Sequence, residues 1–194
     1  IPIEVGVKRV SISPDDIKRV QRICLEAADE RRLLVALISD TGMRLSEALG
    51  LIWKDLRLDH EYPHIQLVPH SWRPLKTSGS KRLIPLVGVA YKAVKIMHQQ
   101  RSTSFLFNSY TDEAGCKGNS CSAALNKWLK HHVPDAVIHS FRHSFRDRLR
   151  NAGVQSELID QLGGWSRQSV GEGYGKGYDL AFAYQSMLRL SQFN

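Results

Sequence analysis

The sequence predicts an α+β fold that is mainly α-helical and contains one small antiparallel β-sheet. Three observations support this class. Apolar residues recur at helical spacing toward both ends of the chain, short segments of β type are confined to the middle, and no strand–helix–strand alternation occurs. A chain of 194 residues is long enough for one domain with a sizeable core, so we expect a single domain over residues 1–194.

Three helices are expected in the first part of the chain. Residues 11–30 form the first, with Ser13 suited to the N-cap. Residues 31–42 predict a second, mostly buried helix that ends at Gly42. Residues 44–56 then predict a third, short helix with apolar residues along one side.

In the middle of the chain, short segments of β type replace the helical spacing. Residues 64–70, 72–77 and 81–86 are short segments rich in β-forming residues, and the turn at 78–80 is expected to join the last two as a hairpin. Helical spacing then returns. The expected helices cover residues 86–101, 119–132, 139–153, 154–164 and 180–190.

The net charge of +8 is concentrated in one part of the chain. No Asp or Glu occurs from Tyr62 to Thr111, and this stretch carries seven cations: Arg73, Lys76, Lys81, Arg82, Lys92, Lys95 and Arg101. An acid-free stretch of this length indicates a face that meets a polyanion, most simply nucleic acid. A basic surface without such a partner is the alternative.

Two compositional features bear on membrane association and on the state of the cysteines. No apolar run approaches the roughly 20 residues that a membrane span needs, so we expect no membrane partner. Cys24, Cys116 and Cys121 form no CxxC pair, which favours reduced thiols in a cytoplasmic protein, with a pair between the last two as the alternative.

The segment "TGMRLSEALGL", residues 41–51, carries the first candidate site residues. Arg44 follows a helix end, and Glu47 lies three residues on, where a carboxylate can orient the guanidinium. A surface ion pair of little consequence is the alternative. Lys76, beside the expected hairpin and within the acid-free stretch, is a candidate for approaching a phosphate.

The segment "HSFRHSF", residues 139–145, carries the second set. His139 and Arg142 are three residues apart on one helix and therefore point the same way, and Arg146 extends the basic stripe. His139 and His143 have the spacing of zinc-binding helices, but Ser140 stands where the zinc-hydrolase signature needs Glu. We therefore expect no metal site, and a basic helix with polar histidines is the plain alternative.

Taken in order, these motifs resemble the tyrosine recombinase, or phage integrase, family over roughly residues 10–190. The resemblance implies a mainly helical catalytic domain with a small sheet, in which a tyrosine attacks a DNA phosphodiester and forms a 3′-phosphotyrosyl link. It implies that Arg44 and Arg142 clamp the phosphate, that Lys76 protonates the leaving 5′-oxygen, and that His139 takes the tyrosine's proton or holds the phosphate. Glu47 would support the site.

The resemblance also directs attention to the segment after "LGG", residues 162–164. Many members have a histidine there and some have tryptophan, so Trp165 is expected to fill that position, as a donor that cannot shuttle protons. Counting nine residues on gives Tyr174 as the nucleophile, and Tyr178 is the fallback. The alternative register starts at Gly164 and ends on a glycine.

The remaining expectations concern partners. The resemblance implies double-stranded DNA, a homotetramer on two DNA sites and accessory DNA-bending proteins, with no cofactor, metal or ATP. The expected DNA contacts are Arg73, Lys81, Arg82 and Arg146. Because Ile1 lies close to the catalytic motifs, we expect the family's N-terminal DNA-clamping domain to lie outside this chain. A type IB topoisomerase-like or telomere-resolving enzyme, and a DNA-binding protein without chemistry, are the alternatives.

Overall fold

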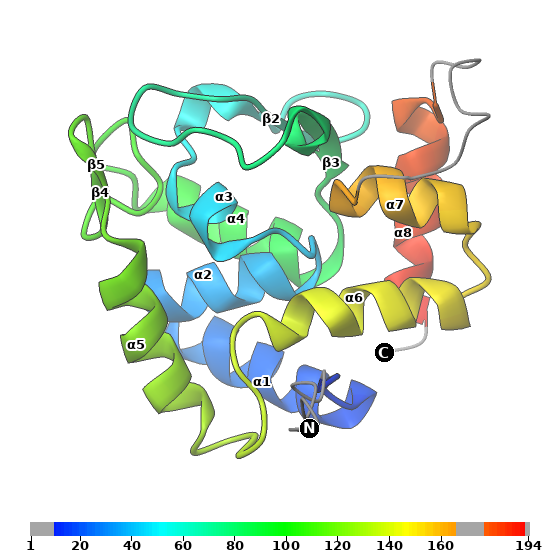
Figure 1. The fold of residues 1–194 in the computed structure, drawn as a ribbon, viewed down its shortest axis with the longest axis horizontal. Helices are drawn as coiled ribbons and strands as arrows, with labels where there is room; N and C mark the ends of the chain where they lie inside the picture. The colour runs from blue at the N-terminus through cyan, green and yellow to red at the C-terminus, as the bar shows by residue number, and fades with distance from the viewer. Residues whose placement is uncertain (1–9, 166–176, 193–194) are drawn as a thin grey trace, which may run out of the picture.

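The computed structural model describes residues 10–165 and 177–192, and it is mainly helical with two small antiparallel sheets (Figure 1). The predicted fold class is therefore confirmed, although one sheet was expected. No helix among the described residues is long and apolar enough to cross a membrane.

Helices α1 (Pro14–Ala27) and α2 (Glu30–Ser39) pack side by side and match the expected ones. The Ser13 hydroxyl accepts the backbone N–H of Asp16, as an N-cap should. Helix α2 is buried over most of its length, because its apolar residues do not keep to one face. It therefore forms the centre of the larger core, with α1 and α4 against it.

The third helix is shorter than expected. Helix α3 covers only Leu45–Leu49, and a 3₁₀ turn, η1 (Trp53–Asp55), and strand β1 (Leu56–Arg57) follow it. Backbone groups just beyond α3 bond to residues 104–106 of a distant loop, as in the Leu106 N–H to Leu51 carbonyl bond of 3.2 Å. Those long-range bonds replace the helical ones, and no pattern in the local sequence predicts them.

The expected hairpin through 78–80 is wrong. Strand β2 (His64–Leu67) pairs directly with β3 (Arg82–Pro85), and β1 pairs with the other edge of β2. The segment between β2 and β3 forms no strand, and Ser78–Ser80 is a 3₁₀ turn, η2. Strands β4 (Thr111–Asp112) and β5 (Gly115–Cys116) make a second sheet that was not expected.

The helices of the second half were predicted well. They are α4 (Gly88–Gln99), α5 (Gly118–Leu129), α6 (Ser140–Asn151), α7 (Ser156–Gly163) and α8 (Leu180–Gln192). Helix α6 joins two cores: Phe141 packs into the larger one, whereas Phe145 and Leu149 pack with α7 and α8. In Figure 1, α7 and α8 lie together at the end of the molecule that α6 reaches.

Candidate active site

A glycine turn that follows α2 packs against α6. Gly42 has φ +63°, and its N–H donates to the Ile38 carbonyl at 3.0 Å. A Cβ at this position would lie 2.3 Å from the Phe145 ring, so only glycine fits without a shift. The Gly42 carbonyl accepts a hydrogen bond of 2.8 Å from Arg142 Nη1. The "TGMR" and "HSFRHSF" motifs are therefore in direct contact.

Glu47 is the buried anchor of two arginines. Its Oε1 lies 2.8 Å from Arg44 Nη1, and its two oxygens lie 3.1 and 3.0 Å from the two terminal nitrogens of Arg82. Burial alone would raise the pKa of Glu47, but the bonds and charges of Arg82 and Arg44 outweigh it and hold that pKa below its ordinary value. Glu47 therefore stays ionised and fixes Arg44, as the spacing predicted.

Arg82 lies inside the protein, whereas we expected it on a DNA-binding surface. Besides the pair with Glu47, it donates to the carbonyls of Leu162 and Ser80 at 2.8 and 2.7 Å. It thus ties β3 to α3 and α7, and it has little surface to offer DNA. No local sequence signal marks this inward position, because the partners Glu47 and Leu162 lie far from Arg82 along the chain.

Arg142 is a buried cation with spare bonding capacity. The residue is only 3% exposed, and its Nη2 is buried with no hydrogen-bond partner among the described residues. Burial, and then the nearby charge of Arg44, lowers the pKa of Arg142 to about 9. A buried donor without an acceptor is costly, and the Arg44 charge lies nearby, so an anion bound between these two arginines would be stabilised.

Trp165 packs on the guanidinium groups of α6. Its ring lies 4.2 Å from Arg142 Cζ and 4.8 Å from Arg146 Cζ, within cation–π range. Arg146 also pairs with Asp160 at 3.0 Å. The ring fits because a Cβ at Gly163 would lie 1.8 Å from it. The structure therefore places Trp165 beside Arg142, and it pairs Arg146, an expected DNA contact, with Asp160 of the same protein.

His139 and Lys76 lie near these arginines. His139 precedes the first residue of α6, and its ring is 5.1 Å from that of His143. Partial burial lowers the pKa of His139, and so do the charges of four neighbours: His143, Arg142, Arg44 and Lys76. His139 and Arg142 of the α6 segment are therefore within electrostatic reach of Arg44 and Lys76, which come from two other segments. Among the described residues, no group of three or more His, Cys, Asp or Glu side chains could hold a metal ion.

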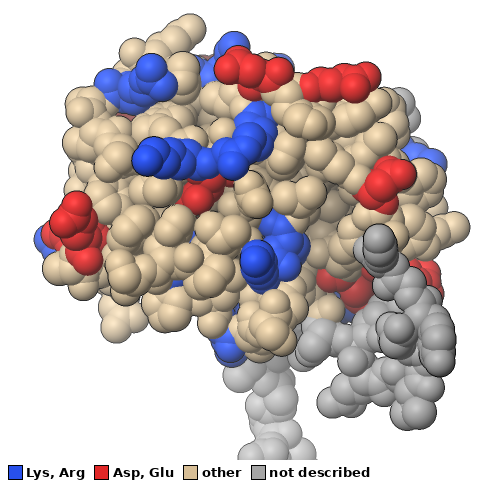
Figure 2. All heavy atoms as spheres, turned by 90° about the horizontal axis from the view of Figure 1, so that it is seen from above, with Lys and Arg blue, Asp and Glu red and all other residues tan. Residues whose placement is uncertain are grey.

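The seven cations of the acid-free stretch do not share one face. Arg73 is 3% exposed and donates to the Val68 carbonyl at 2.6 Å, so like Arg82 it lies inside. Lys76 and Lys81 are exposed beside the site, and the remaining three lie on or just after α4. Figure 2 shows Lys and Arg near the middle of the face seen from above and most acidic residues toward its margins.

The nucleophile assignment lies outside the described residues, since Tyr174 belongs to the stretch 166–176. The fallback, Tyr178, is engaged in packing. Its hydroxyl donates to Gln155, its N–H donates to Gln161 at 2.9 Å, and its ring stacks on Phe182 at 5.3 Å.

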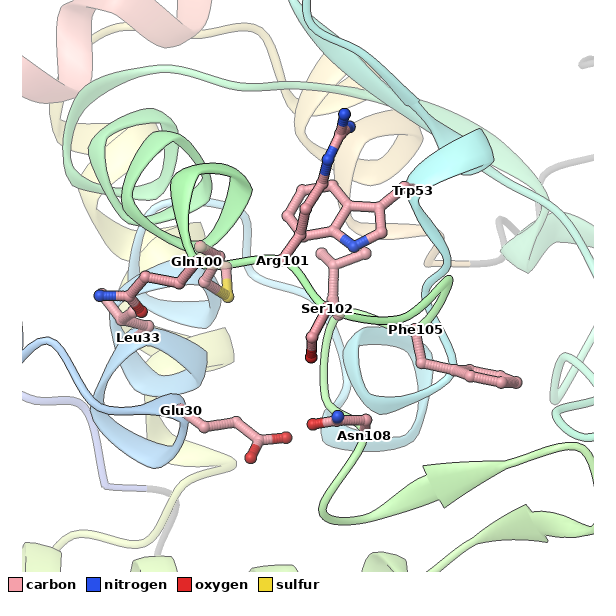
Figure 3. Close-up of a pocket in the computed structure, with 10 residues that line it drawn as sticks. Glu30, Leu33, Trp53, Gln100, Arg101, Ser102, Phe105 and Asn108 are labelled. Carbon is pink, nitrogen blue, oxygen red and sulfur yellow. The ribbon is translucent and has the colours of Figure 1, made fainter.

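A separate pocket lies at the other end of α2 (Figure 3). Its volume is about 110 Å³, and Glu30, Trp53, Arg101 and Asn108 are among its lining residues. Glu30 begins α2 and the Arg44 cluster follows its end, so the ten-residue helix of roughly 15 Å separates the two. The pocket is therefore not part of the candidate active site.

Known proteins share this fold. The Tn1549 transposon integrase in complex with circular intermediate DNA matches with a TM-score of 0.63 at 21% identity, over 86% of this chain and 61% of that one. The XerA recombinase matches with a TM-score of 0.60 at 17% identity, over 97% of this chain and 61% of that one.

Curated relatives extend this likeness to the sequence. The transposase from transposon Tn916 of Enterococcus faecalis is 24% identical over 181 residues, 81% of this chain, and the chain spans only 45% of that protein's length. A resolvase of Escherichia coli is 27% identical over 190 residues, 83% of this chain and 72% of the resolvase. The model of the phage integrase family matches residues 11–178. The chain therefore belongs to the phage integrase family, as its ordered motifs indicated.

Proposed function

We propose that this chain is the catalytic part of a site-specific DNA recombinase that cleaves and rejoins strands through a 3′-phosphotyrosyl intermediate. The observation that carries the proposal is Arg142, a buried cation with an unpartnered nitrogen, near Arg44 and His139. A DNA phosphate placed there would satisfy that nitrogen and meet two fixed guanidinium groups.

The proposed chemistry assigns each group a step. The Tyr174 oxygen attacks the phosphorus while its proton passes to His139, whose lowered pKa keeps the ring neutral near pH 7. The bond to the 5′-oxygen breaks, and Lys76 protonates that oxygen. Arg44 and Arg142 stabilise the charge that grows on the phosphate. The tyrosyl link retains the phosphodiester's energy, so the proposal requires no ATP and assigns no step to a metal.

The relatives support this reading and suggest the partners. A transposase and a resolvase are among them, and the Tn1549 integrase is described with DNA. We propose double-stranded DNA as the substrate, with a tetramer on two sites, accessory DNA-bending proteins and a cytoplasmic location as parts of the same proposal.

The test is covalent capture on DNA. A nicked suicide duplex containing the authentic site should give a protein–DNA adduct that survives denaturant. Tyr174→Phe should abolish the adduct and leave DNA binding unchanged, because it removes only the attacking oxygen. Tyr178→Phe is the matched control and should keep the adduct, since that hydroxyl is bonded to Gln155.

Three results would contradict parts of this proposal. An adduct that persists in Tyr174→Phe and vanishes in Tyr178→Phe would show that the nucleophile register is wrong. No adduct from the unmodified protein would favour a DNA-binding protein without chemistry. Relaxation of supercoiled DNA that lacks any specific site would favour a topoisomerase.

A further inference from the structure

The segment between β2 and β3, residues 68–81, carries Lys76 and is held at both ends. Residues 76–79 are exposed, whereas Arg73 and Ser80 on either side are buried. A catalytic lysine on an exposed segment keeps its position only if the flanks are fixed. The contacts of these flanks therefore decide where the lysine points.

The far flank is tied to the site itself. The Ser80 carbonyl accepts from Arg82 at 2.7 Å, and its hydroxyl lies 3.4 Å from Arg44 Nη1 and 3.0 Å from the Thr77 hydroxyl. This end of the segment is anchored to the Arg44–Glu47–Arg82 cluster.

The near flank begins with a histidine–carboxylate pair. His70 Nε2 lies 2.9 and 3.0 Å from the two carboxylate oxygens of Asp55, and both side chains are largely buried. A carboxylate only accepts, so Nε2 carries the proton. Asp55 also accepts the Ile52 N–H at 3.1 Å. The pair thus fixes His70 to the η1 turn.

An aromatic stack strengthens this attachment. The Trp72 ring lies nearly parallel to that of His70, with centroids 4.4 Å apart, and meets Phe105 edge-on at 5.3 Å. Its Nε1 donates to the Gly50 carbonyl at 3.0 Å. His70 and Trp72 are therefore both bonded to the chain just beyond α3, at Asp55 and Gly50.

Arg73 closes the near flank. Its backbone exchanges two hydrogen bonds of 3.0 and 3.1 Å with His70, which folds residues 70–73 into a tight turn. Its side chain covers Gly50, where a Cβ would lie 2.5 Å from it, and donates to Val68. Burial lowers the pKa of Arg73, and the Asp55 charge opposes that effect.

We propose that Asp55, His70, Trp72 and Arg73 form a latch that holds Lys76 where it can protonate the leaving 5′-oxygen. They are positioning residues, because Asp55 and Arg73 are buried and His70 and Trp72 are partly buried, whereas Lys76 is exposed. This inference rests on the proposed function, since it needs Lys76 to act as the general acid.

The test separates proton donation from the rest of catalysis. Cleavage rates are measured in single turnover on two suicide duplexes, one with the normal scissile 5′-oxygen and one with sulfur in its place. A thiolate leaves without needing a proton, because thiols are far more acidic than alcohols. A defect in Lys76 or in its position should therefore appear only with the oxygen substrate.

On the oxygen substrate, Lys76→Ala should slow cleavage by roughly 100- to 10,000-fold, the usual contribution of a general acid. His70→Ala should slow it by about 10- to 100-fold, as expected from a misplaced catalytic group. His70→Gln keeps a donor for Asp55 and should recover part of the loss. On the sulfur substrate, all three variants should be within a few-fold of the unmodified protein.

A double variant shows whether the latch acts through the lysine. His70→Ala combined with Lys76→Ala should be no slower than Lys76→Ala alone, since coupled residues are not additive. His131→Ala, at an exposed histidine after α5, is the matched control and should cleave both substrates normally. If His70→Ala does not fold, Trp72→Phe replaces it, because phenylalanine keeps the stack and loses only the bond to Gly50.

Failure of the latch and failure of the proposed function give different results. Equal slowing of both substrates by the latch variants, additive losses in the double variant, or no loss at all would overturn the latch while the unmodified protein still cleaves. If the unmodified protein cleaves neither substrate, the proposed function itself fails.

Discussion

At the scale of single residues, the site depends on a cation that is held away from water. Desolvating a charge costs several kcal/mol, and Arg142 recovers part of this through the Gly42 carbonyl and the Trp165 ring. The nearby positive charge of Arg44 repels that of Arg142, and this repulsion lowers the pKa of Arg142 further. A bound phosphate would relieve both effects, so the arrangement is preorganised for an anion rather than for the empty state.

His139 gives a prediction on pH. Its pKa lies below the ordinary value, through partial burial and the charges of His143, Arg142, Arg44 and Lys76. The neutral ring is the form that accepts a proton, so cleavage at limiting DNA should be level near pH 7. It should fall as pH drops through a midpoint below 6.5. The measurement is the second-order rate of adduct formation, which reports the pKa of the free protein.

His139→Gln is the variant that tests this assignment. Glutamine can still bond the phosphate but has no pKa in this range, so the acid limb should disappear while a slower, level rate remains. Persistence of the same limb in His139→Gln would assign the titration to another group. His143→Gln is the comparison, and it should keep the limb with a midpoint raised slightly.

At the scale of elements, the junction between α2 and α6 brings two motifs together. Phe145 packs against Gly42, and Arg142, on the same helix, donates to the Gly42 carbonyl. Arg148 extends the junction, pairing with Asp40 at 2.8 Å. Asp40 also accepts the Val89 N–H of α4 at 2.9 Å and Gln21 Nε2 of α1 at 3.0 Å, so four helices meet at one carboxylate.

A series of glycine substitutions measures this junction. Gly79→Ala meets nothing within 4 Å and has no positive φ, so its unfolding free energy should change by less than about 0.5 kcal/mol. Gly153→Ala adds only the strain of φ +74°, about 1 kcal/mol. Gly42→Ala adds both strain and the clash with Phe145, about 3 kcal/mol in all. Urea denaturation checks the order, and equal losses at Gly42 and Gly153 would contradict it.

Among the helices and strands, those with a local sequence signal could be predicted, and those fixed by distant contacts could not. Seven helices were expected close to where they lie, because each carries a local apolar period or a cap such as Ser13. The hairpin failed because residues 72–77 bond to groups far along the chain, including the Gly50 carbonyl. Such bonds leave no local pattern. The end of α3 was missed for the same reason.

At the scale of the whole molecule, the candidate site was identified from the sequence and the structure together. Local spacing singled out Arg44, His139 and Arg142, and the resemblance implied their roles. The structure brings those side chains near one another. The inward placement of Arg73 and Arg82 could not be predicted, because a charge count does not say which cations pair internally. The net charge of +8 therefore overstates what the acid-free stretch offers to DNA.

The salt dependence of DNA binding tests how that charge is used. The logarithm of the binding constant should fall steeply with the logarithm of salt concentration, by about 0.9 for each phosphate that a cation neutralises. Lys81 is exposed beside the Arg44 cluster, so Lys81→Gln should weaken binding on any sequence and make the slope shallower by about 0.9. Lys92, at a groove between α1 and α4, is the matched control, and Lys92→Gln should leave the slope unchanged. Equal changes in both variants would mean that DNA also contacts Lys92 on α4, whereas no change in Lys81→Gln would remove that lysine from the interface.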